Sequence, residues 1–317
     1  MNSERSGQAA VGPARVAQGA QVSASATGPA SDGSATTLGA QAPSNRKGEI
    51  ELRDVSVWYR KSATSEMVHA VSDVNIRIQP GRFVSLVGPS GCGKTSLMMV
   101  LAGLVPLTSG SATIGGEPVT GPRPRSTGIV FQDPSLLPWR TALDNVALPL
   151  EVAKVNKKER TERARQVLDL VGLSRNWQSY PNELSGGMRQ RVALARGLVT
   201  NPDVLLMDEP FAALDEQSRD EMGAELLRVW ERLNTTVVFI THSLSEAIFL
   251  SDEVIALTGS APGRAGDHIE IPFSRPRDLS LMARPDFAEI RGRLYAALRP
   301  AAQVPGGGAG ADGARPS

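Results

Sequence analysis

The sequence predicts an α/β fold with a mainly parallel core sheet, on the strength of two observations. Between residues 80 and 257, short apolar runs alternate with stretches whose apolar residues have helical spacing, the order expected when helices connect parallel strands. The run at 204–207 is apolar throughout, and the run at 236–240 is apolar after Thr236, as in strands buried on both faces. Ahead of them, residues 50–59 and 74–78 alternate apolar and polar side chains, which predicts a smaller antiparallel β-subdomain.

The composition excludes several classes of protein. The 317-residue chain is 41% hydrophobic and 21% charged, which is ordinary for a globular protein and unlike a fibre or a repeat. Its formal net charge is +1, so no bulk field recruits nucleic acid or anionic lipid. The single cysteine, Cys92, excludes an intramolecular disulfide framework and a cysteine-based zinc finger. No apolar run approaches the roughly 18 residues of a membrane-spanning helix.

Both ends of the chain are expected to be disordered. Residues 1–48 are dominated by Ala, Gly, Ser, Gln, Thr and Pro without apolar periodicity, a composition that buries too little surface to offset the entropy of ordering. The segment 301–317 is similarly rich in glycine. A signal peptide is not expected, because the stretch after Arg5 is too polar. The folded domain is therefore placed at residues 49–300.

Residues 88–96, GPSGCGKTS, fit the phosphate-binding pattern G-x-x-x-x-G-K-S/T at every fixed position. An apolar run at 83–87 precedes them and a helix-forming run at 96–102 follows, which gives the strand, loop and helix of a P-loop. In such a loop the glycines turn backbone N–H groups toward phosphate, Lys94 adds positive charge and Thr95 offers Mg²⁺ a hydroxyl. The residues expected to contact a nucleotide here are Gly88, Pro89, Ser90, Gly91, Cys92, Gly93, Lys94, Thr95 and Ser96.

Polar side chains follow three of the predicted strands. Asp208 and Glu209 end the first fully apolar run, where burying two adjacent carboxylates is costly unless Mg²⁺ and a catalytic water offset that cost. Thr241 and His242 end the run at 236–240. His242 therefore lies on the edge where α/β sheets bind ligands. Gln132 follows a shorter run and is a weaker candidate ligand for Mg²⁺ or water.

Three more segments allow an interpretation from the residues alone. Ser185 is a natural N-cap, and Gly186 and Gly187 leave the N–H groups at that helix start open to an anion. Tyr59, at the end of the first strand, either fills the core or stacks on a nucleotide base, and its position alone favours the core. Leu136, Leu137 and Trp139 lie in a loop that contains Pro134 and Pro138. These apolar side chains either fill a core or face a partner protein, and the two prolines favour a partner.

Together these motifs resemble an ATP-binding cassette (ABC) ATPase. The resemblance extends over roughly residues 49–300, with a helical subdomain at about 133–200. It implies a P-loop NTPase fold with a mainly parallel core sheet, an antiparallel β-subdomain and a helical subdomain. The motif at Ser185 separates this family from other P-loop enzymes. The motifs that carry the resemblance are the P-loop, Gln132, residues 184–191, residues 204–210, residues 213–215 and His242.

The resemblance implies ATP and Mg²⁺ as cofactors and a role for each site residue. Tyr59 would stack on adenine, which replaces the core position favoured by the residue pattern. Glu209 would polarise the attacking water, while His242 and Lys94 would act at the γ-phosphate. The residues that would serve Mg²⁺ are Thr95, Gln132 and Asp208.

Members of this family work as head-to-tail dimers, so the resemblance also implies a homodimer. Ser185, Gly186 and Gly187 would act on the ATP of the other subunit, and Asp215 would link the two halves. Met188 stands where many members have Gln. The anion-facing residues are intact, so activity is expected to be retained.

Within the family, the chain is similar to the importer branch for nitrate, sulfonate, taurine and related anions. The residues that carry this similarity are 131–134, 137–140, 144–146, 262–264 and 275–277. The partners that it implies are separate transmembrane permease subunits and, indirectly, a periplasmic substrate-binding protein. The subunit would be peripheral, at the cytoplasmic face of the bacterial inner membrane.

Two alternative functions are weaker. A nucleic-acid-bound or ribosome-associated ABC ATPase would carry a coiled-coil insertion, zinc-binding cysteines or a second cassette, whereas this chain has one of each key motif and one cysteine. A nucleotide binder without hydrolysis would have lost Glu209 or His242, and both are present. No nucleic-acid partner is therefore expected.

Overall fold

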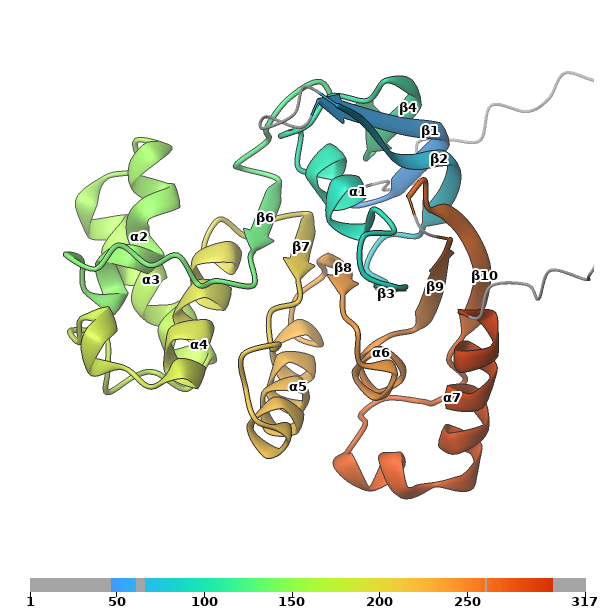
Figure 1. The fold of residues 1–317 in the computed structure, drawn as a ribbon. Helices are drawn as coiled ribbons and strands as arrows, with labels where there is room; N and C mark the ends of the chain where they lie inside the picture. The colour runs from blue at the N-terminus through green and yellow to red at the C-terminus, as the bar shows by residue number, and fades with distance from the viewer. Residues whose placement is uncertain (1–46, 61–65, 260, 299–317) are drawn as a thin grey trace, which may run out of the picture. The chain divides into compact units, whose positions relative to one another are not determined.

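The computed structural model describes residues 47–60, 66–259 and 261–298 (Figure 1). Disorder is expected for residues 1–48, and of these only residues 47 and 48 lie within the described range. The expectation for residues 301–317 lies outside it entirely.

The central feature is a six-stranded sheet in the order β10-β9-β3-β8-β7-β6. Every neighbouring pair from β9 to β6 is parallel, and only β10 pairs antiparallel, with β9. The expected mainly parallel sheet is therefore confirmed. Its strands are β3 (Phe83–Val87), β6 (Thr127–Val130), β7 (Val204–Asp208), β8 (Thr236–Ile240), β9 (Glu253–Thr258) and β10 (Arg264–Glu270).

Alternation along the central strands divides the core between the two faces of this sheet. Leu205 and Met207 of β7 belong to the apolar cluster on one face, while Val204 and Leu206 belong to the cluster on the other. Successive residues of a strand point to opposite faces, so a strand covered on both sides is apolar at most positions. This geometry explains why residues 204–207 and 237–240 are all apolar.

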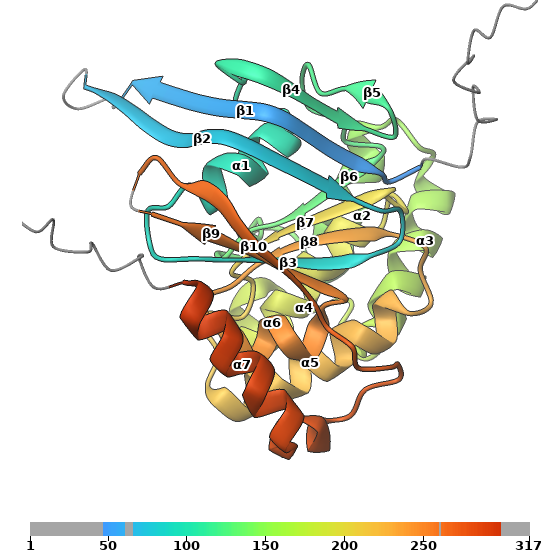
Figure 2. The same cartoon turned by 90° about the vertical axis from the view of Figure 1, so that its right-hand side faces the viewer.

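A four-stranded antiparallel sheet, in the order β2-β1-β4-β5, covers one face of the parallel sheet, with helix α1 (Lys94–Leu101) between the two sheets (Figure 2). The predicted antiparallel β-subdomain is thus present. The buried residues of β1 alternate with exposed ones toward its N-terminus, as expected for a sheet with one face on the core. These strands are β1 (Ile50–Arg60), β2 (Met67–Ile78), β4 (Ser109–Ile114) and β5 (Glu117–Pro118).

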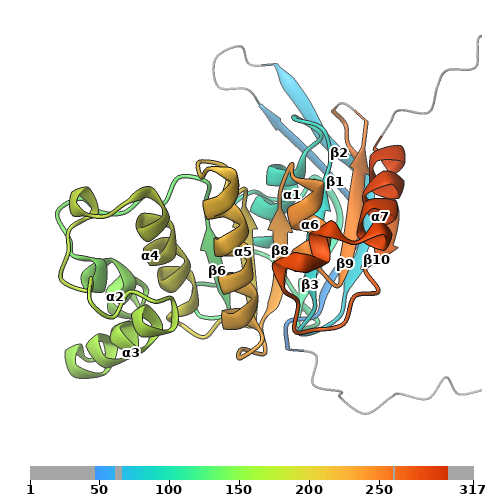
Figure 3. The same ribbon diagram turned by 90° about the horizontal axis from the view of Figure 1, so that it is seen from below.

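Helices cover the opposite face of the parallel sheet and form a separate group beyond β6 (Figures 1 and 3). The group beyond β6 consists of α2 (Ala142–Val152), α3 (Lys157–Leu170) and α4 (Gly186–Leu198), which lie within the range that the sequence assigns to a helical subdomain. The other helices are α5 (Glu216–Trp230), α6 (Leu244–Leu250) and α7 (Pro285–Ala297), with short 3₁₀ turns at η1 (Pro181–Glu183) and η2 (Leu279–Ala283).

Helix α5 begins earlier than its apolar stripe indicates. The stripe predicts a helix from residue 218 to 233, whereas α5 starts at Glu216 and ends at Trp230. The early start follows from a cap, because the Asp215 side chain accepts a hydrogen bond from the Ser218 backbone N–H at 2.9 Å. Such a cap satisfies an N–H group that the first turn cannot pair. Trp230, at the other end, is 9% exposed and packs edge-on against Phe83, as expected of a core residue.

Candidate active site

The P-loop connects β3 to α1 through backbone conformations that only glycine adopts without strain. Gly91 and Gly93 have φ of 79° and 94°, in the region where a side chain is disfavoured. A Cβ on Gly93 would also lie 2.6 Å from the Ala70 carbonyl oxygen, and one on Gly88 would lie 2.6 Å from that of Leu257. The glycines of the motif therefore let the loop turn sharply while it packs against neighbouring backbone.

Lys94 lies inside the curve of this loop. Its side chain is buried, and its Nζ donates to the carbonyl oxygens of Gly88 at 2.9 Å and Pro89 at 3.0 Å. No side chain caps the N-terminus of α1, and its first turn holds no acidic residue. The free N–H groups of that turn and the lysine ammonium thus create an electropositive place for an anion.

A cavity of about 350 Å³ opens beside the loop. The antiparallel sheet, the P-loop and the ends of the central strands all contribute to its walls. Its size and its mixture of apolar and charged walls suit a small charged molecule. Its lining residues are Tyr59, Val68, Ala70, Ser90, Gly91, Gly93, Lys94, Thr95, Ser96, Glu209, His242 and Ala261.

Asp208 has the surroundings of a Mg²⁺ ligand. Burial raises the pKa of its carboxyl, against the lowering effect of a hydrogen bond from Thr95, and the adjacent Glu209 raises it further. The Thr95 Oγ1 lies 3.3 Å from Asp208 Oδ1. A desolvated carboxylate next to a hydroxyl offers the hard oxygen ligands that Mg²⁺ prefers, and a cation there would offset the burial of charge. The residues present therefore fit the metal.

Glu209 has a strained backbone. Its φ is 45°, a left-handed conformation that costs a residue other than glycine about 1 kcal/mol. The Glu209 backbone N–H donates to the Ile240 carbonyl oxygen at 3.0 Å, which ties the turn to the end of β8. In this conformation Glu209 Oε1 lies 2.6 Å from His242 Nε2, so the two predicted catalytic side chains meet at the cavity.

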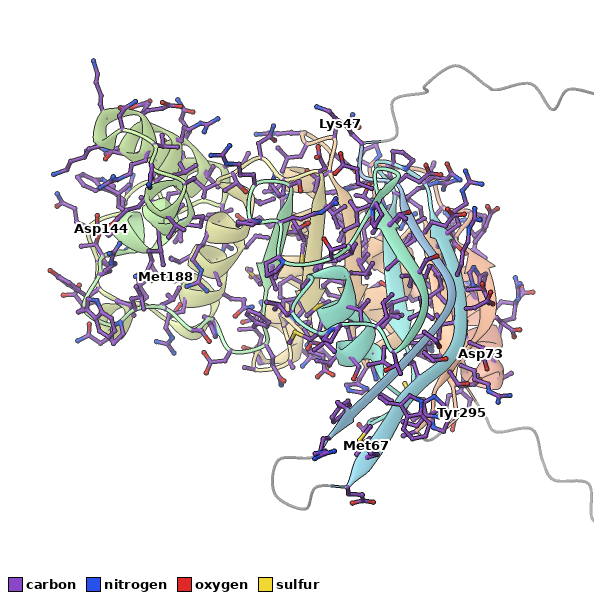
Figure 4. All side chains as sticks on the ribbon, turned by 90° about the horizontal axis from the view of Figure 1, so that it is seen from above. Lys47, Met67, Asp73, Asp144, Met188 and Tyr295 are labelled. Atoms are coloured by element: carbon purple, nitrogen blue, oxygen red, sulfur yellow. The ribbon has the colours of Figure 1, made fainter. Side chains whose placement is uncertain are left out.

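Tyr59 is 43% exposed and lines the cavity. The core position that its sequence pattern alone favours is therefore wrong. Its neighbour Trp58 stacks instead on His69, with ring centroids 3.9 Å apart. The rings of Trp58 and His69 belong to the hairpin of β1 and β2. Met67, the first residue of β2, is labelled in Figure 4. An exposed tyrosine at this wall is available for the stacking role that the family resemblance implies.

Several predicted site residues lie away from the cavity. Gln132 is exposed just beyond the end of β6 and is not among the residues that line the cavity. Ser185 caps α4 by accepting from the Met188 N–H. Apart from its chain neighbours and its own helix backbone, no described residue has an atom within 4 Å of a Cβ placed on Gly187. Asp215 caps α5. One chain therefore brings together the P-loop, Tyr59, Asp208, Glu209 and His242, but not the signature residues.

Met188, where the sequence departs from the family pattern, lies on the first turn of α4 (Figure 4). Its side chain is partly buried and packs against the apolar cluster of the helices. Methionine adapts to irregular apolar surroundings. The departure therefore contributes to packing while Ser185 and Gly186 beside it remain exposed.

Gly263 is a residue of this site that sequence reasoning does not explain. A Cβ there would lie 1.8 Å from the Cys92 carbonyl oxygen, so only glycine fits. The Gly263 N–H donates to the Ala70 carbonyl oxygen at 3.0 Å, and the Ser72 N–H donates to the Gly263 oxygen at 2.9 Å. The turn thus closes over the back of the P-loop, where Cys92 is fully buried. A Pro-Gly pair indicates a turn but not what the turn packs against.

These features define a class of protein, a P-loop nucleoside triphosphatase with a carboxylate and a histidine at adjoining strand ends. A family model described as ABC transporter matches residues 71–212. The taurine import ATP-binding protein TauB of Rhizobium johnstonii is 45% identical over 236 residues, which cover 73% of this chain and 89% of TauB. The nitrate import ATP-binding protein NrtD of Synechococcus elongatus is 43% identical, over 70% of this chain and 82% of NrtD. This chain belongs to the ABC transporter family.

Solved structures agree with this assignment. The chain is similar to the ATP-binding cassette MJ0796 in a structure described as a dimeric post-hydrolysis state bound to ADP and Pi. The TM-score is 0.62 and the sequence identity 32%, over 71% of this chain and 100% of that one. The fold is thus that of an ABC ATPase cassette, and the expected P-loop NTPase fold is confirmed.

Proposed function

We propose that this chain is the ATP-hydrolysing subunit that energises an ABC importer for nitrate, sulfonate, taurine or a related small anion. The similar proteins TauB and NrtD are named as taurine and nitrate import ATP-binding proteins. Their identities of 45% and 43%, respectively, extend over most of both chains. The transported anion itself is not selected by the site described here, because its cavity is formed around the P-loop.

The observation that carries the proposal is the Glu209–His242 pair at the edge of the P-loop cavity. The P-loop N–H groups and Lys94 bind and orient the phosphates of ATP. Thr95 and Asp208, with Gln132 from the neighbouring strand end, would hold Mg²⁺, which neutralises charge that develops on the phosphates. Glu209 orients and polarises the attacking water, and His242 holds the Glu209 carboxylate in place and contacts the γ-phosphate.

The location of the signature residues supports a homodimer. Ser185 and Gly186 are exposed at the N-terminus of α4 and do not line the cavity of their own chain. A helix N-terminus with bare glycines binds an anion only if one is brought to it. In a head-to-tail pair, this end of α4 would meet the nucleotide held by the other subunit, and Asp215 would lie at the joint between the two.

The partners in this proposal are separate permease subunits and, through them, a periplasmic substrate-binding protein. Among the described residues, none of the helices has the length and apolar character that crossing a membrane requires. The side chain of Trp139 is 71% exposed, on the segment that follows Gln132. Tryptophan is enriched among the residues that contribute most to binding at protein interfaces. We place the subunit at the cytoplasmic face of a bacterial inner membrane, as a peripheral protein without a nucleic-acid partner.

The test is ATP hydrolysis by the purified chain, with and without Mg²⁺, followed by reconstitution with its permease subunits. We expect Mg²⁺-dependent hydrolysis that taurine, a sulfonate or nitrate stimulates when the binding protein is present. Absence of Mg²⁺-dependent hydrolysis from folded protein would contradict the enzymatic assignment. Hydrolysis that none of these anions stimulates in the reconstituted system would contradict the importer branch.

A further inference from the structure

Glu246, in the first turn of α6, is a buried carboxylate with two partners on different segments. It is only 8% exposed. Its Oε2 accepts a hydrogen bond of 2.5 Å from Thr241 Oγ1, and its Oε1 lies 3.2 Å from Arg219 Nε. Burial raises the pKa of Glu246, against the lowering effects of Thr241 and Arg219. A carboxylate so placed is tolerated because both of its oxygens are paired.

One arm of this arrangement fixes the segment that carries His242. Thr241, the residue before it, is 4% exposed and donates its hydroxyl proton to Glu246. The same hydroxyl accepts from the Ser243 backbone N–H at 2.9 Å. The hydroxyl group thereby has a defined donor and a defined acceptor. The backbone on both sides of His242 is therefore held to α6.

The other arm fixes the segment that carries Asp215. Arg219 lies on α5, and its Nη2 donates to the Leu214 carbonyl oxygen at 3.0 Å. Its Nε makes the ion pair with Glu246 without hydrogen-bond geometry. Since Leu214 directly precedes Asp215, the guanidinium connects the segment expected at the dimer joint to the helix that follows His242.

A second cavity is shared by this arrangement and the catalytic pair. It measures about 150 Å³, and Arg219, Thr241 and Glu246 line it together with Glu209 and His242. None of Arg219, Thr241 and Glu246 lines the larger cavity beside the P-loop. These three residues therefore influence the reaction through the two segments that they join and through the charge of Glu246 near Glu209, and not from the wall of the larger cavity.

We propose that Arg219, Glu246 and Thr241 are positioning residues, which set the segment of Asp215 at a fixed place relative to His242 and so link closure of the dimer to hydrolysis. The proposal rests on the function proposed above. Displacement of catalytic groups by about 1 Å costs about a hundredfold in rate, so loss of this connection lowers turnover at saturating ATP. Arg219, Thr241 and Glu246 do not themselves line the cavity beside the P-loop, so affinity for Mg-ATP stays close to that of the wild type.

The experiment measures kcat, KM, Mg-ATP affinity and Tm for Glu246→Gln in the full chain. Glutamine keeps an acceptor for Thr241 and removes the charge that Arg219 pairs with. We expect kcat to fall by about ten- to a hundredfold, with affinity for Mg-ATP changed by less than about twofold. Arg219→Met should behave alike, and the double variant should be no slower than either single one, because the three residues act as one unit.

Asp252→Asn is the matched control. Asp252 follows α6 at its other end, where it is partly buried, pairs with Arg275 at 2.9 Å and accepts from the Phe83 N–H. Loss of that charge should lower Tm and leave kcat unchanged. A kcat for Glu246→Gln within about twofold of this control would overturn the inference. Wild-type protein that does not hydrolyse ATP would instead overturn the proposed function.

A second pair of variants keeps the inference testable if Glu246→Gln does not fold. Thr241→Val removes the hydroxyl at nearly constant volume, and Thr241→Ser retains it. We expect the valine variant to lose about tenfold in kcat and the serine variant to recover most of the wild-type rate. Equal kcat values for the two variants would contradict the positioning role.

Discussion

Glu209 has a left-handed backbone conformation, and its side chain lines the cavity. Glu209→Gln keeps the shape of the side chain and removes its charge, so we expect ATP affinity to persist while turnover falls by about two to four orders of magnitude. The measurement is the steady-state rate together with equilibrium binding of ATP. An ATP-bound dimer should accumulate, detectable by size-exclusion chromatography. Near-normal hydrolysis by Glu209→Gln would contradict the assignment of Glu209 as the general base.

Asp208 gives a prediction of pH dependence. Burial raises the pKa of its carboxyl in the folded chain above the unfolded value, so the ionised form destabilises the fold at neutral pH, and protonation removes that cost as the pH falls. Without Mg²⁺ at pH 7.5, Asp208→Asn should therefore raise Tm by about 1–3 °C. The difference in Tm between Asp208→Asn and the wild type should narrow as the pH falls through the raised pKa of the folded chain toward the pKa of the unfolded chain. Mg-ATP should stabilise only the wild type strongly.

A Tm for Asp208→Asn below that of the wild type in EDTA would contradict this account. Thr95 remains able to donate to the amide oxygen of asparagine, so a loss of its hydrogen bond does not explain such a result. The comparison therefore separates the cost of the buried charge from the geometry of the site.

At the scale of elements, the segment after Gln132 combines an anchored interior with an exposed tip. Asn145 of α2 is fully buried, and its side chain accepts from the Leu137 N–H and donates to the carbonyl oxygens of Leu137, Arg140 and Thr141. Leu136 packs partly against the core of the helices, whereas Trp139 is 71% exposed. The alternative that all three apolar side chains fill the core is therefore wrong for Trp139.

Trp139→Ala should change Tm by less than about 2 °C. As a side chain proposed to contact the permease, its loss should weaken that association by about 2 kcal/mol or more. Trp230→Ala is the control, because that side chain is 9% exposed and its loss should cost about 3–5 kcal/mol of stability. Melting curves and permease pull-down check both variants. A large fall in Tm for Trp139→Ala, or unchanged binding, would contradict the interface.

At the scale of the whole molecule, the separation of the signature from its own cavity leads to a complementation experiment. Lys94→Ala and Ser185→Arg subunits should each be inactive alone. Mixed dimers contain one site with both defects and one intact site, so a mixture should regain hydrolysis, up to about a quarter of the wild-type rate if intact sites act independently. No recovery from subunits shown to exchange would contradict a signature that acts across the dimer.

The sequence predicts the fold and the strand-end residues well because both depend on local pattern. Asp208, Glu209 and His242 follow runs that are almost entirely apolar, since both faces of the parallel sheet are covered. Features that depend on distant segments leave no such pattern. The contact of Gly263 with Cys92 joins parts of the chain far apart in sequence, and the pairing of Arg219 with Glu246 crosses from one helix to another. The helix α5 boundary is missed for a smaller reason, since the cap at Asp215 overrides the apolar stripe.

The turn at Gly263 has a consequence for which molecules the cavity accepts. It is hydrogen-bonded to β2 of the antiparallel sheet and packed against the P-loop, while β2 pairs with the strand that carries Tyr59. The wall that would hold the base and the loop that would hold the terminal phosphates are therefore joined through hydrogen-bonded backbone. A nucleoside triphosphate would contact both of them, whereas a nucleoside monophosphate would contact only one.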